Sequence, residues 1–170
     1  MVFPLGHVGI GTHLVPRRLR EGLPWRWLAF GCLLPDVVDK PIWVVAWWLG
    51  ARSELIDSAK LIGHSAFFAV AVAVVARILR TRQMVAIAYA LPTHIVLDMI
   101  ADAGKGGGLG VWKSWLFWPF QLPDLHVLMV ASSPLRELAS EINSAVYLGG
   151  EIVGGLILLW DWRRNRSKDP

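Results

Sequence analysis

The sequence has little cysteine and little charge. Cys32 is its only cysteine, which excludes a disulfide within the chain and indicates a small buried hydrophobe. Charged residues make up 18% of the 170 positions and hydrophobic residues 55%, which is too apolar for an ordinary soluble domain of this length. The apolar start MVFPLGHVGIG has no basic residue before it, so no cleavable signal peptide is expected. The composition indicates an integral membrane protein.

Two abundant residue types agree with this interpretation. The ten tryptophans suit membrane interfaces, and the 16 glycines are tolerated in transmembrane helices. The net charge of +4 comes from short basic clusters between apolar runs, which indicates positive loops at a membrane and no nucleic-acid partner. The length predicts a single integral membrane domain over residues 1–170, and no internal repeat is present.

Four segments have the length of about 20 mostly apolar residues that a bilayer crossing requires. Residues 61–79, 84–101 and 144–162 are the clearest. Residues 25–50 are long enough but are interrupted at 35–41 by two prolines and three charged residues, so a kinked or interrupted crossing is expected there. The sequence therefore predicts an all-α, polytopic membrane helical bundle with about four transmembrane helices. Short interfacial helices at 1–16 and roughly 122–140 and a glycine loop at 103–110 complete the prediction.

Basic residues set the expected orientation. Three clusters, at 17–26, 77–82 and 163–168, hold 11 of the 17 lysines and arginines. Four crossings would place all three clusters on one side of the membrane, and the positive-inside rule makes that side the cytoplasm. The expected location is therefore the bacterial cytoplasmic (inner) membrane, with a multi-pass chain and cytoplasmic basic loops.

Ionisable residues interrupt the predicted crossings at overlapping depths. Counted from the cytoplasmic ends, Asp36, His94 and Glu151 lie roughly 16 Å deep, near the middle of a core about 30 Å thick. Asp39 and Asp98 lie about one turn further out, and His64 lies at about the outer third. Such residues normally face a bundle interior or a water-filled cavity. One shared polar site explains them most economically.

The residue types indicate a metal. Imidazole and carboxylate together suit zinc, manganese or iron, with zinc favoured, whereas magnesium and calcium prefer oxygen ligands alone. Asp36 and Asp39 are spaced i,i+3, and His94 and Asp98 are spaced i,i+4, so each pair can point one way from its helix. These ligands exceed the three that a catalytic zinc uses, which indicates one or two ions or a second set of residues that orients the ligands.

Structural roles are the alternative for each residue taken singly. An intramembrane histidine often forms a hydrogen bond between helices. Asp36 and Asp39 could lie in a surface loop, with Asp39 paired to Lys40 or capping a helix. Glu151 could equally contact a neighbouring helix. Two further histidines, His13 and His126, are expected at the membrane interface.

Several motifs also resemble a known family. GHVGIG, GCLLPDVVDKP, LIGHSAFF, THIVLD and, after a glycine loop, WLFWPF occur in the order found in membrane-bound metal-dependent hydrolases, which are also described as LexA-binding and inner-membrane-associated. The resemblance covers roughly residues 5–120 and implies metal ligands at the following positions. They are His7, Asp36, Asp39, His64, His94 and Asp98.

This chain also departs from the family pattern. Many relatives have Asp-x-Asp-His where it has Asp36-Val37-Val38-Asp39-Lys40, and Arg-Gly-x-Thr-His-Ser where it keeps only Gly63-His64-Ser65. The absent arginine and threonine leave any substrate phosphate contact that they make in relatives unassigned here.

The leading functional hypothesis is a membrane-embedded metal-dependent hydrolase of a lipid or lipid-linked phosphoester. Metal-activated water would attack, and a carboxylate not fully engaged by metal, Asp39 or Asp98, would act as base. Lys105 or Lys113 could bind an anionic headgroup, although solvated loop lysines are the simpler expectation. The alternatives are a non-enzymatic metal-binding membrane protein, either a transporter or a regulatory scaffold, and a polar network without metal. A homo-oligomer is compatible with each.

Overall fold

The computed structural model describes residues 4–50, 59–104, 109–120 and 144–166. The described residues contain seven helices and no strand, so the predicted all-α fold is confirmed for this part of the chain. The helices are α1 (Pro4–Leu14), α2 (Arg17–Arg20), α3 (Trp25–Trp48), α4 (Ala66–Leu79), α5 (Arg82–Gly104), α6 (Leu109–Leu116) and α8 (Ala145–Arg166). The predicted interfacial helix at 122–140 lies outside the described residues.

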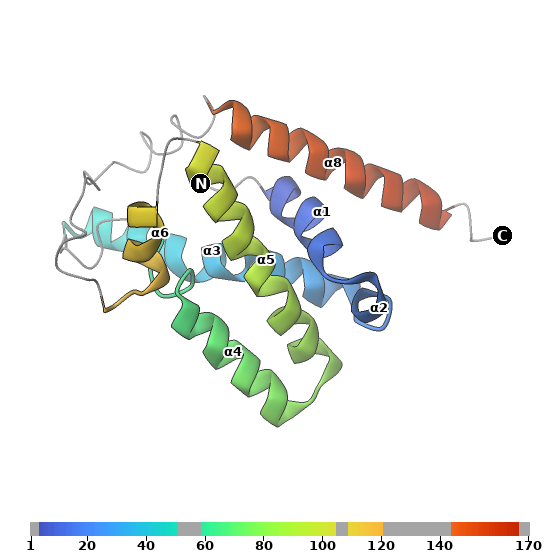
Figure 1. The fold of residues 1–170 in the computed structure, drawn as a ribbon, viewed down its shortest axis with the longest axis horizontal. Coiled ribbons are helices and arrows are strands. Elements are labelled where there is room, and N and C mark those ends of the chain that lie inside the picture. The colour runs from blue at the N-terminus through green and yellow to red at the C-terminus, as the bar shows by residue number, and fades with distance from the viewer. Residues whose placement is uncertain (1–3, 51–58, 105–108, 121–143, 167–170) are drawn as a thin grey trace.

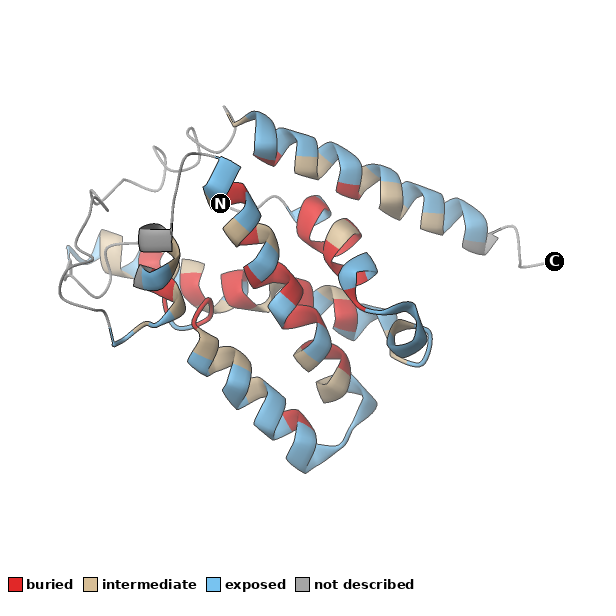
Figure 2. Cartoon of the chain, viewed as in Figure 1, coloured by how far each residue is buried: buried red, intermediate tan, exposed pale blue. Residues whose placement is uncertain are grey.

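Helix α5 is the centre of the arrangement. It packs against α1, α3 and α4, while α1 fills the space between α5 and α8 (Figure 1). Buried residues concentrate where α1, α3 and α5 meet, whereas α4 and α8 are exposed over most of their surface (Figure 2). The short helix predicted at 1–16 is present as α1, and it carries a buried face that includes Gly6, His7 and Thr12.

Helices α1 and α8 cross at glycines. A Cβ atom added to Gly154 would lie 2.2 Å from the carbonyl oxygen of Leu5 and 2.6 Å from Cα of Gly6. Only a residue without a side chain permits so close an approach of two backbones, and small residues serve this purpose at many membrane helix contacts. This crossing holds α1 in the interior of the bundle.

Two of the four predicted crossings have the length and composition of membrane spans. These are α5 and the α8 segment Ala145–Arg164, whereas α4 has 14 residues and is a shorter apolar helix. Within its most apolar stretch, 11% of α8 is buried, so its apolar side chains face outward as they do toward lipid. Helix α3 is one 24-residue helix with Pro35 and Pro41 inside it, so the predicted interruption is absent.

Helix α4 begins later than the sequence predicts. The Ser65 side chain accepts a hydrogen bond of 3.1 Å from the amide of Phe68, which caps the helix at its first turn. His64 consequently lies in the loop before α4 and not within the helix. Residues 59–65 before α4 are mostly buried, and their backbone contacts Asp39 of α3.

The basic residues gather at one end of the molecule. The guanidinium group of Arg82, at the start of α5, donates hydrogen bonds to the carbonyl oxygen of Gly22, which follows α2. Arg17 and Arg20 of α2 line a hollow together with Arg164, near the end of α8. The starts of α3 and α5 and the end of α8 thus share this basic end.

Candidate functional site

The six predicted site residues come together in one buried cluster. His7 comes from α1, Asp36 and Asp39 from α3, His64 from the loop before α4, and His94 and Asp98 from α5. Each of the six has less than a tenth of its surface exposed. The cluster lies where α1, α3 and α5 meet, which is the most buried part of the described chain (Figure 2).

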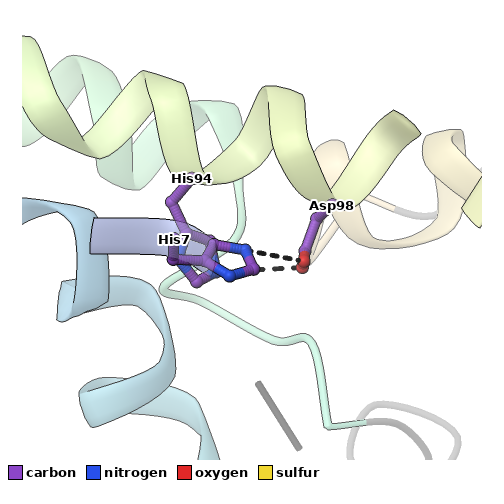
Figure 3. Close-up of side chains that lie close together, drawn as sticks. All are labelled: His7, His94 and Asp98. Atoms are coloured by element: carbon purple, nitrogen blue, oxygen red, sulfur yellow. Dashed lines mark hydrogen bonds and ion pairs between the residues drawn. The ribbon is translucent and has the colours of Figure 1, made fainter. Parts of the chain in front are cut away.

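Two overlapping triads have the geometry of metal ligands. His7, His94 and Asp98 form one, and Asp36, His64 and His94 form the other; within each, the ligand atoms lie within 4.8 Å of one another. In the first triad, His7 Nε2 lies 3.3 Å from Asp98 Oδ1 and His94 Nε2 lies 3.8 Å from Asp98 Oδ2 (Figure 3). The i,i+4 spacing places His94 and Asp98 on the same face of α5, as predicted.

The second triad brings α3 and the 61–64 loop to the same point. His64 Nε2 lies 3.6 Å from Asp36 Oδ1 and 3.2 Å from Asp98 Oδ2. His94 Nε2 lies 3.9 Å from Asp36 Oδ2. The two carboxylates therefore flank the same pair of histidine nitrogens.

Hydrogen bonds fix the orientation of both histidine rings. His94 Nδ1 lies 2.6 Å from the carbonyl oxygen of Cys32, which can only accept, so Nδ1 carries the proton. His64 Nδ1 lies 2.7 Å from Asp39 Oδ2 and donates to that carboxylate. Each neutral ring consequently presents an unprotonated Nε2 to the cluster. Such an orienting bond on the second ring nitrogen is usual for metal-binding histidines.

The two free nitrogens face each other. His64 Nε2 and His94 Nε2 are 3.1 Å apart, so two lone pairs meet at hydrogen-bond distance with no proton available between neutral rings. The buried atoms Asp36 Oδ1 and Asp98 Oδ2 have no hydrogen bond among the described residues, and their contacts are ion pairs with the ammonium groups of Lys40 and Lys60 at 3.0 and 3.1 Å. Two buried lone pairs that face each other are costly, and a cation between them removes that cost. The donor set and its geometry therefore fit a divalent metal.

Asp39 has a different position from the other carboxylates. Its oxygens accept backbone hydrogen bonds of 2.6 Å from Leu61, 2.7 Å from Gly63 and 3.2 Å from His64, besides the bond from the His64 ring. A Cβ atom on Gly63 would lie 2.6 Å from the carbonyl oxygen of Pro35, so glycine lets this loop reach α3. Asp39 thus holds the loop and the His64 ring, behind the atoms that face the cluster.

Two lysines and a further aspartate border the cluster. Lys40 Nζ lies 3.0 Å from Asp36 Oδ1, which differs from the expected Lys40–Asp39 pairing. Lys60 Nζ lies 3.1 Å from Asp98 Oδ2 and 2.9 Å from Asp102 Oδ2. Burial acts to lower the pKa of Lys60, but the two carboxylates outweigh burial, so the pKa lies above its ordinary value. The Lys60 side chain is therefore a cation.

The sequence prediction missed Lys60 and Asp102. Asp102 follows Asp98 at i+4 on α5, so helical spacing alone could have added it to the cluster. Lys60 has no such signal, because a lysine at the edge of an apolar segment normally indicates the membrane surface. Its contact with Asp98 depends on the path of the loop before α4.

Three other residues considered in the sequence lie apart from the ligand atoms. Glu151 accepts hydrogen bonds from the amides of Leu5 and Gly6, at 3.2 and 2.5 Å, and so caps the first turn of α1. His13 lies 3.5 Å from Asp161 on the basic end of the molecule. His126 lies outside the described residues.

A mostly apolar cavity reaches the cluster from one side. It has a volume of about 140 Å³ and lies between α1, α5 and α8, with His7 and Glu151 among its lining residues. Leu97, Ile100 and Val146 supply apolar surface to it. The cavity gives the His7 side of the cluster an apolar approach.

Comparison with known proteins identifies the family. No curated protein and no solved structure matches the chain. A family model described as YdjM inner membrane protein matches residues 3–163, which include every helix of the fold up to the last turn of α8 and all six residues of the cluster. The chain belongs to the YdjM inner membrane protein family.

Proposed function

We propose that this protein is a membrane-embedded metal-dependent hydrolase that acts on a lipid or lipid-linked phosphoester. The observation that carries the proposal is the pair of Nε2 atoms of His64 and His94, 3.1 Å apart, flanked by two buried carboxylates. When both rings are neutral with their protons on Nδ1, these two nitrogens are acceptors that face each other, and a cation between them satisfies both.

Five residues would hold the metal in this proposal. His64, His94, Asp36 and Asp98 supply the atoms that converge, and His7 Nε2 approaches from α1. Zinc is favoured by the mixed nitrogen and oxygen donors, with manganese or iron as the other candidates. A bound divalent ion would lower the pKa of a water molecule to near 7 and polarise a phosphoryl oxygen.

The proposal gives the two catalytic candidates different roles. Asp98 lies between His7, His64 and Lys60, so a carboxylate oxygen not taken by metal could accept a proton from attacking water. Asp39 already accepts four hydrogen bonds, which leaves it the role of positioning His64. We therefore assign proton transfer to Asp98 and not to Asp39.

The substrate class rests on the surroundings of the cluster. The cavity beside His7 is lined mainly by apolar side chains, which suits the hydrocarbon part of a lipid next to its headgroup. Helix α8 presents apolar side chains outward, so the cavity lies close to the lipid-facing surface. An amphiphile could then enter laterally from the bilayer.

The proposal also includes a topology. Helices α3, α4, α5 and α8 would all cross the bacterial inner membrane, with the basic end in the cytoplasm. Helix α4 is short for a crossing, but the loop that carries His64 continues its path into the buried region. A homo-oligomer is compatible with this topology.

Elemental analysis of the purified protein is the first test. We expect bound zinc, manganese or iron in protein purified without chelator, and its loss in His94→Ala and Asp36→Ala. His13→Ala is the matched control, because His13 lies at the basic end with Asp161 and should leave the metal content unchanged. Metal-free wild-type protein purified under these conditions would contradict the proposal.

Hydrolysis assays then separate an enzyme from a metal-binding scaffold or transporter, the alternative function. Phospholipids and polyprenyl phosphates are the substrates, with and without chelator. We expect phosphate ester cleavage that chelator abolishes and that Asp98→Asn lowers by at least a hundredfold. Metal binding without cleavage of either lipid class would favour the non-enzymatic alternative.

A further inference from the structure

The described charges of the cluster do not balance. Four carboxylates, from Asp36, Asp39, Asp98 and Asp102, face two ammonium groups, from Lys40 and Lys60. With the histidines neutral, the described residues leave a net charge of −2 around the buried carboxylates Asp36, Asp39 and Asp98. An uncompensated buried charge is strongly unfavourable, so this region attracts positive charge.

The histidines limit how that charge can be supplied. His94 belongs to both ligand triads, but its Nδ1 donates to Cys32, so one lone pair is left for one ion. Both triads therefore cannot be filled at once with His94 as a full ligand of each. One divalent ion neutralises the described cluster, and a second would leave it with an excess of two positive charges.

We infer that the cluster holds one divalent cation and that Lys60 acts as the second positive centre, binding an anionic phosphate oxygen next to that ion. The assignment of this anion to a substrate rests on the proposed function. The number of ions is independent of the proposed function, because it follows from the charges of the cluster and from the single ring nitrogen that His94 has left for a metal.

The position of Lys60 suits this role. Its ammonium group lies 3.1 Å from Asp98 Oδ2, an atom that also lies 3.2 Å from His64 Nε2. Lys60 is therefore one carboxylate oxygen away from the ligand atoms. Asp102, at 2.9 Å, holds the ammonium group from the other side. An ion that takes Asp98 as ligand weakens the hold of Asp98 on Lys60, which frees donor capacity for an incoming anion.

Trp115 supplies a second polar contact at the same place. Its ring lies 4.9 Å from Lys60 Nζ, measured to the ring centroid, and packs edge-on against the ring of His64. The side chain is 1% exposed, and its indole nitrogen has no hydrogen-bond partner among the described residues. A buried N–H without an acceptor is unusual, and a phosphate oxygen near Lys60 could accept from it.

The number of ions is tested without any assay of hydrolysis. The detergent-purified protein is stripped with chelator and titrated with zinc and, separately, manganese, while bound metal is measured by elemental analysis and by native mass spectrometry. We expect one tightly bound equivalent per chain. Two tightly bound equivalents would overturn the inference, and so would none.

The Lys60→Gln variant tests the second positive centre, because it should change the affinities for metal and for phosphate in opposite directions. Removing a cation beside the ion should tighten metal binding at least tenfold, and it should weaken the binding of inorganic phosphate to the metal-loaded protein at least tenfold. Arg77→Gln is the control, because it removes the same charge from an exposed position on α4 and should change either constant less than twofold.

Any other pattern contradicts the role of Lys60. A Lys60→Gln variant that binds metal more weakly would make Lys60 a structural support, and unchanged phosphate affinity would place the anion elsewhere. If the Gln variant does not fold, Lys60→Met, which keeps most of the length of the aliphatic chain, is measured in its place. Failure of the enzyme proposal is visible separately, as one bound ion and Lys60-dependent phosphate binding without lipid hydrolysis.

A second probe identifies the source of the phosphate. Dihexanoyl phosphatidic acid, used below its micelle concentration, carries the same headgroup chemistry with short acyl chains. Tighter binding than inorganic phosphate supports a lipid phosphate, and equal binding supports a free phosphate. In both cases the affinity must fall in Lys60→Gln for the inference to stand.

Discussion

At the scale of single residues, the distribution of protons decides what this cluster can bind. His94 donates from Nδ1 to a backbone carbonyl, and His64 donates from Nδ1 to Asp39. Each ring, when neutral, therefore presents an acceptor nitrogen to the same small volume. Sequence spacing places these side chains together. The hydrogen bonds from the two Nδ1 atoms then orient the rings, and this orientation makes the cluster a candidate metal site.

Asp39 should be essential for that orientation. Asp39→Asn replaces one acceptor oxygen by an amide NH₂ group, which would oppose the backbone N–H groups of Leu61 and Gly63. Loss of a buried charged hydrogen-bond acceptor costs about 3 kcal/mol. We therefore expect a lower melting temperature in detergent and a metal affinity reduced by about ten- to hundredfold.

Asp161→Asn is the control for this change. It makes the same replacement at the basic end of the molecule, where Asp161 is partly exposed and pairs with His13. We expect it to alter neither the melting temperature nor the metal affinity. If Asp39→Asn behaved like Asp161→Asn, Asp39 would not be the residue that positions His64.

The residue types of the site could be predicted from the sequence, whereas their roles could not. His94 and Asp98 share a helix, and the spacing of four residues alone places them on one face. Asp39 and Asp36 share a helix too, but their roles differ because the backbone of the 61–64 loop passes Asp39 and not Asp36. The contacts of a loop with a helix distant in the sequence leave no periodic signal.

At the scale of helices, the crossing of α1 and α8 controls the position of His7. Glycines at the crossing bring the two backbones together, and Glu151 of α8 accepts hydrogen bonds from the first turn of α1. A carboxylate at a helix N-terminus also interacts favourably with the helix dipole. The described contacts of α8 with α1 thus connect a helix with an exposed apolar surface to His7 of the cluster.

Gly154→Ala should separate these two helices. The added methyl group would lie 2.2 Å from the carbonyl oxygen of Leu5, so α8 must move outward, at a cost of about 2 kcal/mol. The expected results are a lower melting temperature and weaker metal binding through the displacement of His7. Gly149→Ala is the control, since nothing lies within 4 Å of the position of its added methyl group.

Glu151 should act on the same crossing by a different contact. Glu151→Ala removes the acceptor for two backbone amides of α1, which costs about 1 kcal/mol for a capping interaction. Glu151→Gln keeps one acceptor oxygen and should retain part of the stability. We expect the melting temperature to be highest for the wild type, lower for Glu151→Gln and lowest for Glu151→Ala. Equal melting temperatures for Glu151→Ala and the wild type would exclude a capping role.

The helices themselves follow from hydrophobic runs, with errors that have local causes. The predicted 84–101 and 144–162 segments correspond to α5 and α8. The 61–79 segment was too long at its start, because the Ser65 cap fixes the beginning of α4 after His64. The 25–50 segment is expected to be kinked or interrupted at its prolines, and α3 continues through both without interruption, packed against α5. Tertiary packing overrides the local cost of proline here.

At the scale of the whole molecule, charge and apolar surface have separate locations. The basic residues of α2, the start of α5 and the end of α8 meet at one end. Exposed apolar side chains cover α4 and α8, including Val70, Ile78, Ile152 and Leu156. A monomeric soluble protein rarely exposes so much apolar surface, whereas a lipid-facing bundle requires it.

The proposed topology predicts which positions reagents can reach in intact cells. Arg20→Cys and Thr81→Cys place thiols at the basic end, and Lys113→Cys places one on the exposed face of α6, beyond the far end of α5. Each is made in a Cys32→Ala background, because Cys32 is the only native cysteine. If the basic end is cytoplasmic, a membrane-impermeant maleimide should label position 113 in intact spheroplasts, and positions 20 and 81 only after lysis.

Labelling of positions 20 and 81 from outside would reverse the orientation. Labelling of these two positions from opposite sides would mean that α3 and α4 do not both cross, because the chain between the two positions would then cross the membrane an odd number of times.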